Sequence, residues 1–173
     1  MAAGRKSGIG PIVSSAHLAD NAAPELSELE FALTIANNAF QRWIVRGTTA
    51  AGMGELGALD VLVLHTVNHR GRPKKLADIC LVLNQEDTHV VSYALKKLEK
   101  LGLVESARQG KEKYASTTQA GTALCERYRE IREACLIGAV ESMAEKSDIS
   151  DLARLLRALS GLYDQAARAA TAL

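Results

Sequence analysis

The stretch DTHVVSYALKKLEKLGLVESARQGKEKYASTT, residues 87–118, joins two hydrophobic patterns of different period. Its first half carries apolar residues three and four positions apart, which is the spacing of one helix face. These residues are Val91, Ala94, Leu95, Leu98 and Leu101. Its second half holds two short strand-like runs around Gly110, a pattern typical of a β-hairpin. We therefore expect an amphipathic helix that is followed at once by a two-stranded ribbon.

Local signals mark both ends of this helix. Asp87 stands at its start, where a carboxylate accepts hydrogen bonds from free backbone amides. Gly102 stands just past its end, where a left-handed residue commonly terminates a helix. The face opposite the apolar stripe comprises Thr88, His89, Ser92, Tyr93, Lys96 and Lys100. Because such side chains suit base edges and phosphate oxygens, we expect this helix to enter the major groove of DNA.

Two shorter helices are predicted upstream, at residues 58–68 and 76–83, with Asn84–Glu86 as the connection to the helix that begins after Asp87. Lys74 and Lys75 lead into the second of these helices. Two helices joined by a short turn and followed by a hairpin make a winged helix-turn-helix. The predicted fold is therefore mainly α with a small β-hairpin wing.

Three longer helices are predicted outside this unit, at about residues 24–51, 118–146 and 150–170. The first opens with a proline followed by a glutamate, which suits a helix N-terminus. Its apolar stripe is continuous, and it is long for a small domain, so we expect it to pack against more than its own core. In the second, the stripe is formed by Tyr128, Ile131 and Cys135.

The charges of the chain are unevenly distributed. Residues 70–113 contain ten Lys and Arg against six Asp and Glu, a net charge of +4, whereas the remainder carries 11 against 14, or −3. A basic centre between acidic flanks is what a polyanion-binding surface needs, although a solvated surface of uneven charge explains the same count. The cations Lys74 and Lys75 lie where they can contact phosphate.

Composition narrows the class of protein further. At 173 residues the chain fits one domain with helical extensions. It contains no apolar run long enough to span a bilayer and no signal-peptide pattern, so no membrane association is expected, and residues 1–22 are interpreted as a flexible tail. Three cysteines without framework spacing fit the reducing cytoplasm.

The central segment resembles the multiple-antibiotic-resistance-regulator (MarR) family. The matching residues are Leu76-Ala77, Val91-Ser92, Leu95, Leu98-Glu99-Lys100, Gly102-Leu103-Val104 and Thr117 through Gly121. They cover about residues 57–122. The resemblance implies a winged helix-turn-helix regulator of transcription, more often a repressor, whose terminal helices interlock to form a homodimer on double-stranded DNA. It also implies that a small-molecule effector can bind between the helical arms and the winged domain.

The resemblance and the residue chemistry together define candidate sites. The candidate DNA-binding residues are Lys74, Lys75, Thr88, His89, Ser92, Tyr93, Lys96, Arg108, Lys111 and Lys113. The candidate dimerisation residues are Leu29, Leu33, Phe40, Leu152, Leu155, Leu159 and Leu162. The expected division is a tail (1–22), a dimerisation helix and linker (23–56), the winged domain (57–118) and the C-terminal dimerisation helices (119–173). The wing, residues 106–113, is short and lacks the family's usual Asp-x-Arg element.

Other readings of the same residues stay open. A winged-helix module that binds a protein partner instead of DNA is the alternative, favoured by the acidic pair Glu86-Asp87 at the start of the recognition helix. Asp87 itself is either a helix cap or an acceptor from a cytosine amino group. His65 and His69 are four residues apart and could share a helix face, but no further residue completes a set of metal ligands. We expect no cofactor. The sequence also contains no catalytic grouping, so the chain is not predicted to be an enzyme.

Overall fold

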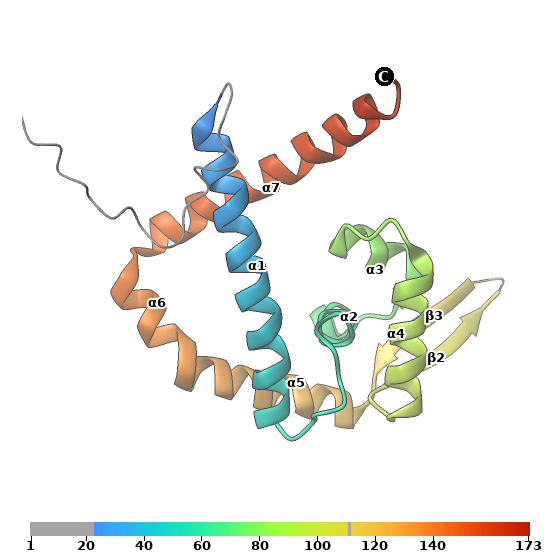
Figure 1. Ribbon diagram of the computed structural model, residues 1–173. Coiled ribbons are helices and arrows are strands. Elements are labelled where there is room, and N and C mark those ends of the chain that lie inside the picture. The colour runs from blue at the N-terminus through green and yellow to red at the C-terminus, as the bar shows by residue number, and fades with distance from the viewer. Residues whose placement is uncertain (1–22, 111) are drawn as a thin grey trace, which may run out of the picture.

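The computed structural model describes residues 23–110 and 112–173, so the predicted tail (1–22) and Lys111 lie outside the described residues. The chain is mostly helical and carries one small antiparallel sheet (Figure 1). The elements are α1 (Pro24–Ala50), α2 (Ala58–Asn68), the 3₁₀ turn η1 (His69–Gly71), β1 (Lys74–Lys75), α3 (Leu76–Leu83), α4 (Thr88–Lys100), β2 (Val104–Gln109), β3 (Glu112–Thr117), α5 (Gln119–Arg132), the π-helical turn η2 (Glu133–Ile137), α6 (Gly138–Met143) and α7 (Lys146–Ala170).

The predicted recognition helix is confirmed as α4, with both of its end signals. The Asp87 carboxylate accepts a hydrogen bond from the His89 amide at 2.8 Å, so Asp87 acts as the N-cap. Gly102 follows the helix with φ of 69°, a backbone conformation that costs glycine little. The predicted apolar stripe is turned inward, and Val91 and Leu98 are fully buried against α2 and α3. The side chains opposite them remain on the outside of the winged unit.

The sheet has three strands rather than the two predicted. Its order is β1-β3-β2, with all pairs antiparallel. The hairpin β2–β3 is the wing, and it runs from Val104 paired with Thr117 to Gln109 paired with Glu112. Lys74 and Lys75, expected only to lead into a helix, pair instead with Ala115 and Tyr114 of β3. This short strand is set by a partner about 40 residues away, which local pattern does not reveal.

The two halves of α1 have different surroundings. Its C-terminal half packs on α2 and α5, where Ile44, Gly47 and Thr48 are buried. Arg127 of α5 donates a hydrogen bond to the Ala51 carbonyl oxygen at 2.8 Å and fixes the end of α1. The N-terminal half of α1 extends away from the winged unit and is largely exposed (Figure 1). The core therefore belongs to the winged unit and the adjoining parts of α1 and α5.

The sequence predicted a regular helix after the wing. The structure differs, because this helix contains the π-helical turn η2. A π turn accommodates one extra residue compared with an α turn. Consequently Leu136, and not Cys135, continues the stripe of Tyr128 and Ile131: Leu136 is partly buried, whereas Cys135 is exposed. The expected stripe of Tyr128, Ile131 and Cys135 was therefore wrong at its last position.

The C-terminal arm breaks earlier than predicted, at Ala144, and α7 begins with Glu145 and Asp148 capping each other's backbone amides. No residue of α7 is buried. Figure 1 shows α7 crossing the N-terminal half of α1, and the Tyr163 hydroxyl donates to the Glu30 carboxylate at 2.9 Å there. No helix of the described residues is long and apolar enough to cross a membrane.

Candidate nucleic-acid interface and adjoining cavity

The outer face of α4 presents the predicted base-reading side chains. Thr88, His89, Tyr93 and Lys96 are exposed, Tyr93 by 73%, and Ser92 is partly buried. An exposed tyrosine of this size on an ordered helix has a large apolar ring with a polar tip, which fits contact with a second macromolecule. The arrangement leaves the N-terminal half of α4 free to approach a groove.

Four of the predicted DNA-binding residues meet in one small cavity between α4, β1 and the wing. It has a volume of about 100 Å³ and is lined by Lys74, Leu76, Ser92, Leu95, Lys96, Ser106, Lys113 and Ala115. An apolar floor lies among Lys96, Lys113, Ser92 and Ser106, a combination of side chains that suits an oxyanion. We refer to these lining residues as the lysine cavity.

Two of the predicted cations are engaged within the protein. Lys74 Nζ donates to the carbonyl oxygens of His69 and Arg72, both at 2.7 Å, and so holds the turn before β1. Lys75 forms an ion pair of 2.5 Å with Glu112 and lies 5.5 Å from the centre of the Tyr114 ring. The hydrogen bond with Glu112 raises the pKa of Lys75, followed by that with Tyr114. Both lysines brace β1 and the wing.

Two more of the predicted DNA-binding residues lie at or next to the hairpin turn of the wing. Arg108 is exposed near the hairpin turn and has no ion-pair partner among the described residues. Lys111 is in that turn and lies outside the described residues. Arg108 is the cross-strand partner of Lys113, which lines the lysine cavity, but Arg108 does not line that cavity itself.

Two acids missed by the sequence analysis organise this face. Glu99 of α4 accepts hydrogen bonds from Ser106 of β2 and, at 2.8 Å, from Lys113 of β3. Asp60 of α2 pairs with Lys97 of α4 at 2.7 Å, and its side chain is only 11% exposed. Neither pair is visible from local spacing, because the partners are far apart in the chain.

The chain is similar to known winged-helix proteins in sequence and in structure. Residues 56–121 match the model of a winged helix DNA-binding domain. Two structures of similar fold are NMB1585, a MarR family regulator from Neisseria meningitidis, and a mutant MarR from E. coli in complex with operator DNA. The first is 21% identical with a TM-score of 0.65, covering 82% of this chain and 94% of its own. The second is 17% identical with a TM-score of 0.64, covering 81% and 99%.

The chain has the fold of the MarR-family regulators. The resemblance indicated by the sequence is thus confirmed at the level of the fold. A third MarR-like fold is that of CouR from Rhodococcus jostii RHA1, solved with p-coumaroyl-CoA, at 14% identity and a TM-score of 0.64, covering 76% of this chain and 90% of CouR. A search among curated proteins finds no match. The matched model is that of a winged helix DNA-binding domain, and the fold is the one that these regulators share.

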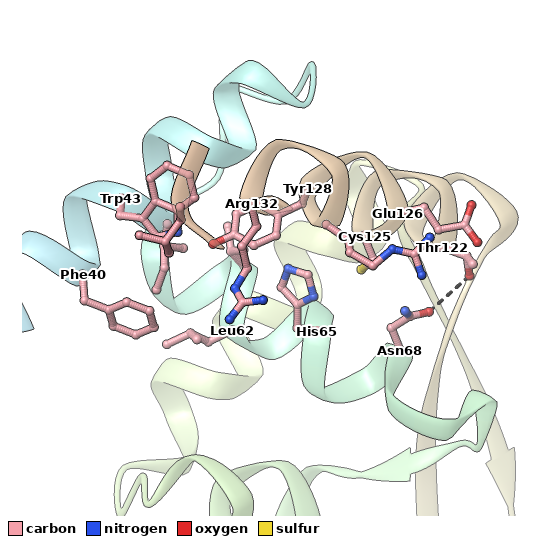
Figure 2. Close-up of a pocket in the computed structure, with 14 residues that line it drawn as sticks. Phe40, Trp43, Leu62, His65, Asn68, Thr122, Cys125, Glu126, Tyr128 and Arg132 are labelled. Carbon is pink, nitrogen blue, oxygen red and sulfur yellow. Dashed lines mark hydrogen bonds between the residues drawn. The ribbon is translucent and has the colours of Figure 1, made fainter. Parts of the chain in front are cut away.

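The MarR-like fold encloses a second, larger cavity between α1, α2 and α5, with a volume of about 630 Å³. Figure 2 shows the aromatic side chains of Phe40 and Trp43 at one end, and Asn68 and Thr122 at the other, joined by a hydrogen bond of 3.3 Å. Arg132 reaches from α5 toward α2 and ends near His65 (Figure 2). The cavity therefore combines aromatic walls with a cationic group.

The ionisable groups of this cavity are shifted by burial. The His65 ring packs edge-on against Tyr128 with centroids 4.9 Å apart, and desolvation lowers its pKa, so the neutral imidazole is favoured. Burial, with a smaller contribution from Glu126, raises the pKa of the Cys125 thiol to about 11. Such a thiol is not activated for redox chemistry. Among the described residues, no group of three or more His, Cys, Asp or Glu side chains is placed to hold a metal.

Proposed function

We propose that the protein is a cytoplasmic, homodimeric transcriptional regulator, acting as a repressor, that binds a specific sequence of double-stranded DNA through α4 and the wing. The observation that carries this proposal is the lysine cavity beside the exposed face of α4. A phosphate bound there fixes the position and orientation of α4 in the major groove, while His89, Ser92 and Tyr93 contact base edges. The DNA complex of the E. coli MarR mutant supports the same mode of use for this fold.

The exposed apolar side chains of α1 and α7 support a homodimer. Among the candidate dimerisation residues, the exposed ones are Leu29 at 40%, Phe40 at 51%, Leu152 at 51%, Leu155 at 57% and Leu162 at 62%. Leu33 and Leu159 are partly buried and lie beside α7 and α1. So many exposed large apolar side chains on two long helices are a feature of surfaces that bind a partner. In a dimer, two copies of α4 would face adjacent major grooves of a pseudo-palindromic site.

The large cavity supports release by a small-molecule effector. It lies between α1 and α5, which lead to the proposed dimer arms, and α2, which packs on α4. A ligand that fits only one spacing of these helices would shift the population toward that spacing and change the separation of the two α4 helices. The complex of CouR with p-coumaroyl-CoA supports a ligand-responsive role for this fold.

A protein-interaction module is the second candidate function. It is favoured by two apolar side chains of α3 that face solvent, Leu81 at 82% and Val82 at 69% exposure. A DNA-binding assay separates the two candidates, because a module of this kind has no affinity for duplexes selected from a random pool.

DNA binding is expected to depend on the lysine cavity. In a mobility-shift assay on a duplex selected from a random pool, changing Lys96 and Lys113 together to Ala should weaken binding by roughly tenfold or more at low salt. The slope of log affinity against log salt should become shallower by up to about 1.8, since two phosphate contacts are lost. The matched control changes Lys146 and Arg157 of α7 to Ala, with the same change in net charge. The proposed function fails if the unaltered protein binds no duplex, or if both double variants behave alike.

The dimer is expected to be visible in sedimentation velocity at micromolar concentration. Changing Leu155 and Leu162 to Asp should convert the dimer into a monomer, because each buried leucine contributes about 1.5–3 kcal/mol and a carboxylate in its place is costly to bury. Arg157→Asp on the polar face of the same helix serves as the control and should stay dimeric. A monomer of the unaltered protein at this concentration would contradict the model.

A further inference from the structure

Glu99 lies in the last turn of α4 and points at the base of the wing. One of its carboxylate oxygens accepts two hydrogen bonds, from the Ser106 hydroxyl and from Lys113 Nζ at 2.8 Å. The Glu99 side chain is 27% exposed and that of Lys113 is 55% exposed. Both groups that Glu99 holds line the lysine cavity. A single carboxylate therefore accepts hydrogen bonds from a hydroxyl and an ammonium group of the residues that line the proposed phosphate position.

The carboxylate of Glu99 is held in its charged form. Burial alone would raise the pKa of Glu99, but the hydrogen bonds from Lys113 and Ser106, together with the charges of Lys113 and Lys96, lower it on balance. Ionised Glu99 therefore offers to Lys113 what a DNA phosphate offers, an anionic oxygen at hydrogen-bond distance. It also lies within electrostatic range of Lys96, which has no ion-pair partner among the described residues.

We propose that Glu99 acts as an internal competitor of the DNA backbone, holding Lys113 and Ser106 in the absence of DNA and limiting both the affinity for DNA and its dependence on salt. This inference rests on the proposed DNA binding. Glu99 is thus a residue that tunes affinity without touching a base. It keeps the wing against α4, and a phosphate entering the lysine cavity has to share Lys113 with it.

We expect the fold to tolerate the loss of this ion pair, so that the charge can be removed by itself. Pairs as exposed as this one contribute little to stability. The Glu99→Gln change preserves the shape of the side chain, and the amide oxygen can accept the same two hydrogen bonds. Only the negative charge disappears, so a change in DNA binding reports on the charge. Glu99→Ala is a second variant that removes the charge without adding an amide donor.

The test compares Glu99→Gln with Glu105→Gln in a salt titration of binding to the selected duplex. Glu105 is the exposed neighbour of Ser106 on β2 and has no ion-pair partner among the described residues, so it provides the same charge change without releasing Lys113. We expect Glu99→Gln to bind about two- to fivefold tighter at low salt, the range of an exposed charge interaction. Its slope should steepen by a fraction of the roughly 0.9 that one phosphate contributes, since Lys113 is then no longer shared between Glu99 and a phosphate. Glu105→Gln should leave the slope unchanged.

The same change made in a Lys113→Ala protein tests whether the effect of Glu99 on DNA binding depends on Lys113. In the Lys113→Ala protein, Glu99→Gln should give no gain in affinity, because the group for which Glu99 competes is missing. The inference is overturned if folded Glu99→Gln and Glu99→Ala bind no tighter than the unaltered protein, if Glu105→Gln gains equally, or if the gain persists without Lys113. Failure of the unaltered protein and of both Glu99 variants to bind any duplex would instead overturn the proposed function along with this inference.

Discussion

The Gly121→Ala variant is expected to lose about 3 kcal/mol of unfolding free energy, at the upper end of what overpacking costs. A Cβ at Gly121 would lie 2.0 Å from the Leu103 carbonyl oxygen, far inside contact distance. The obstacle is a backbone atom, which cannot turn away as a flexible side chain can. The same carbonyl accepts a hydrogen bond from the Thr118 amide at 3.1 Å, so the first turn of α5 and the base of the wing would have to separate.

Thermal unfolding followed by circular dichroism checks this expectation, and for a chain of this size the midpoint should fall by roughly 6–12 °C. Gly161→Ala on α7 is the matched control. Gly161 is also helical, but its added Cβ meets nothing within 4 Å. That variant should be stabilised by up to about 1 kcal/mol, since alanine favours the helix over glycine. Equal midpoints for Gly121→Ala and the unaltered protein would contradict this expectation, because the backbone at Leu103 would then accommodate the added Cβ at little cost.

The Asp60→Ala variant is expected to lose about 2–3 kcal/mol, because one oxygen of Asp60 serves two partners. It accepts from the Gly57 amide at 2.8 Å, which caps α2, and from Lys97 Nζ at 2.7 Å, which ties α2 to the recognition helix. Asp60 is 8% exposed. The Lys97 side chain is 32% exposed, so the loss is smaller than for a fully buried pair.

Urea denaturation of a small set of variants separates the two contributions. Asp78→Ala, which removes an exposed carboxylate from the first turn of α3, should change stability by only a few tenths of a kcal/mol. Combining Asp60→Ala with Lys97→Met should restore part of the loss, because it removes the ammonium group left without a partner. No recovery in the double variant would assign the whole effect to the cap of α2.

The sequence predicted those parts of the fold that depend on local signals. α4 begins after Asp87 and ends before Gly102 as expected, because a cap, a periodic stripe and a glycine all lie within the helix or next to it. β1 was missed for the opposite reason: two residues carry no period, and only the distant strand β3 makes them a strand. The division of the chain into a winged domain and dimerisation helices stays a prediction.

The residue types of the candidate site could be predicted from the sequence, but the ion pairs that these residues form could not. Lys75 and Lys113 were expected as free cations, and the structure pairs them with Glu112 and Glu99. Such pairs depend on strand register and on the packing of the wing against α4, which a charge count along the chain does not contain. The count of cations therefore overstates the positive charge that this face offers to DNA, and Glu99 had no local feature that marked it.

The π-helical turn at Glu133–Ile137 has a consequence for how the length of this chain can vary. Each residue of an α-helix advances the chain by about 100° around the helix axis. The π turn absorbs one extra residue, so losing one residue here would restore a regular turn and leave α6 in nearly the same phase relative to α5. Leu136 would then take the place that a regular helix gives to residue 135, and it would stay in the wall of the large cavity. Losing one residue from the regular part of α5 would instead rotate everything beyond it by about 100°, so this turn is the place where the length of the helix can change without turning the arm.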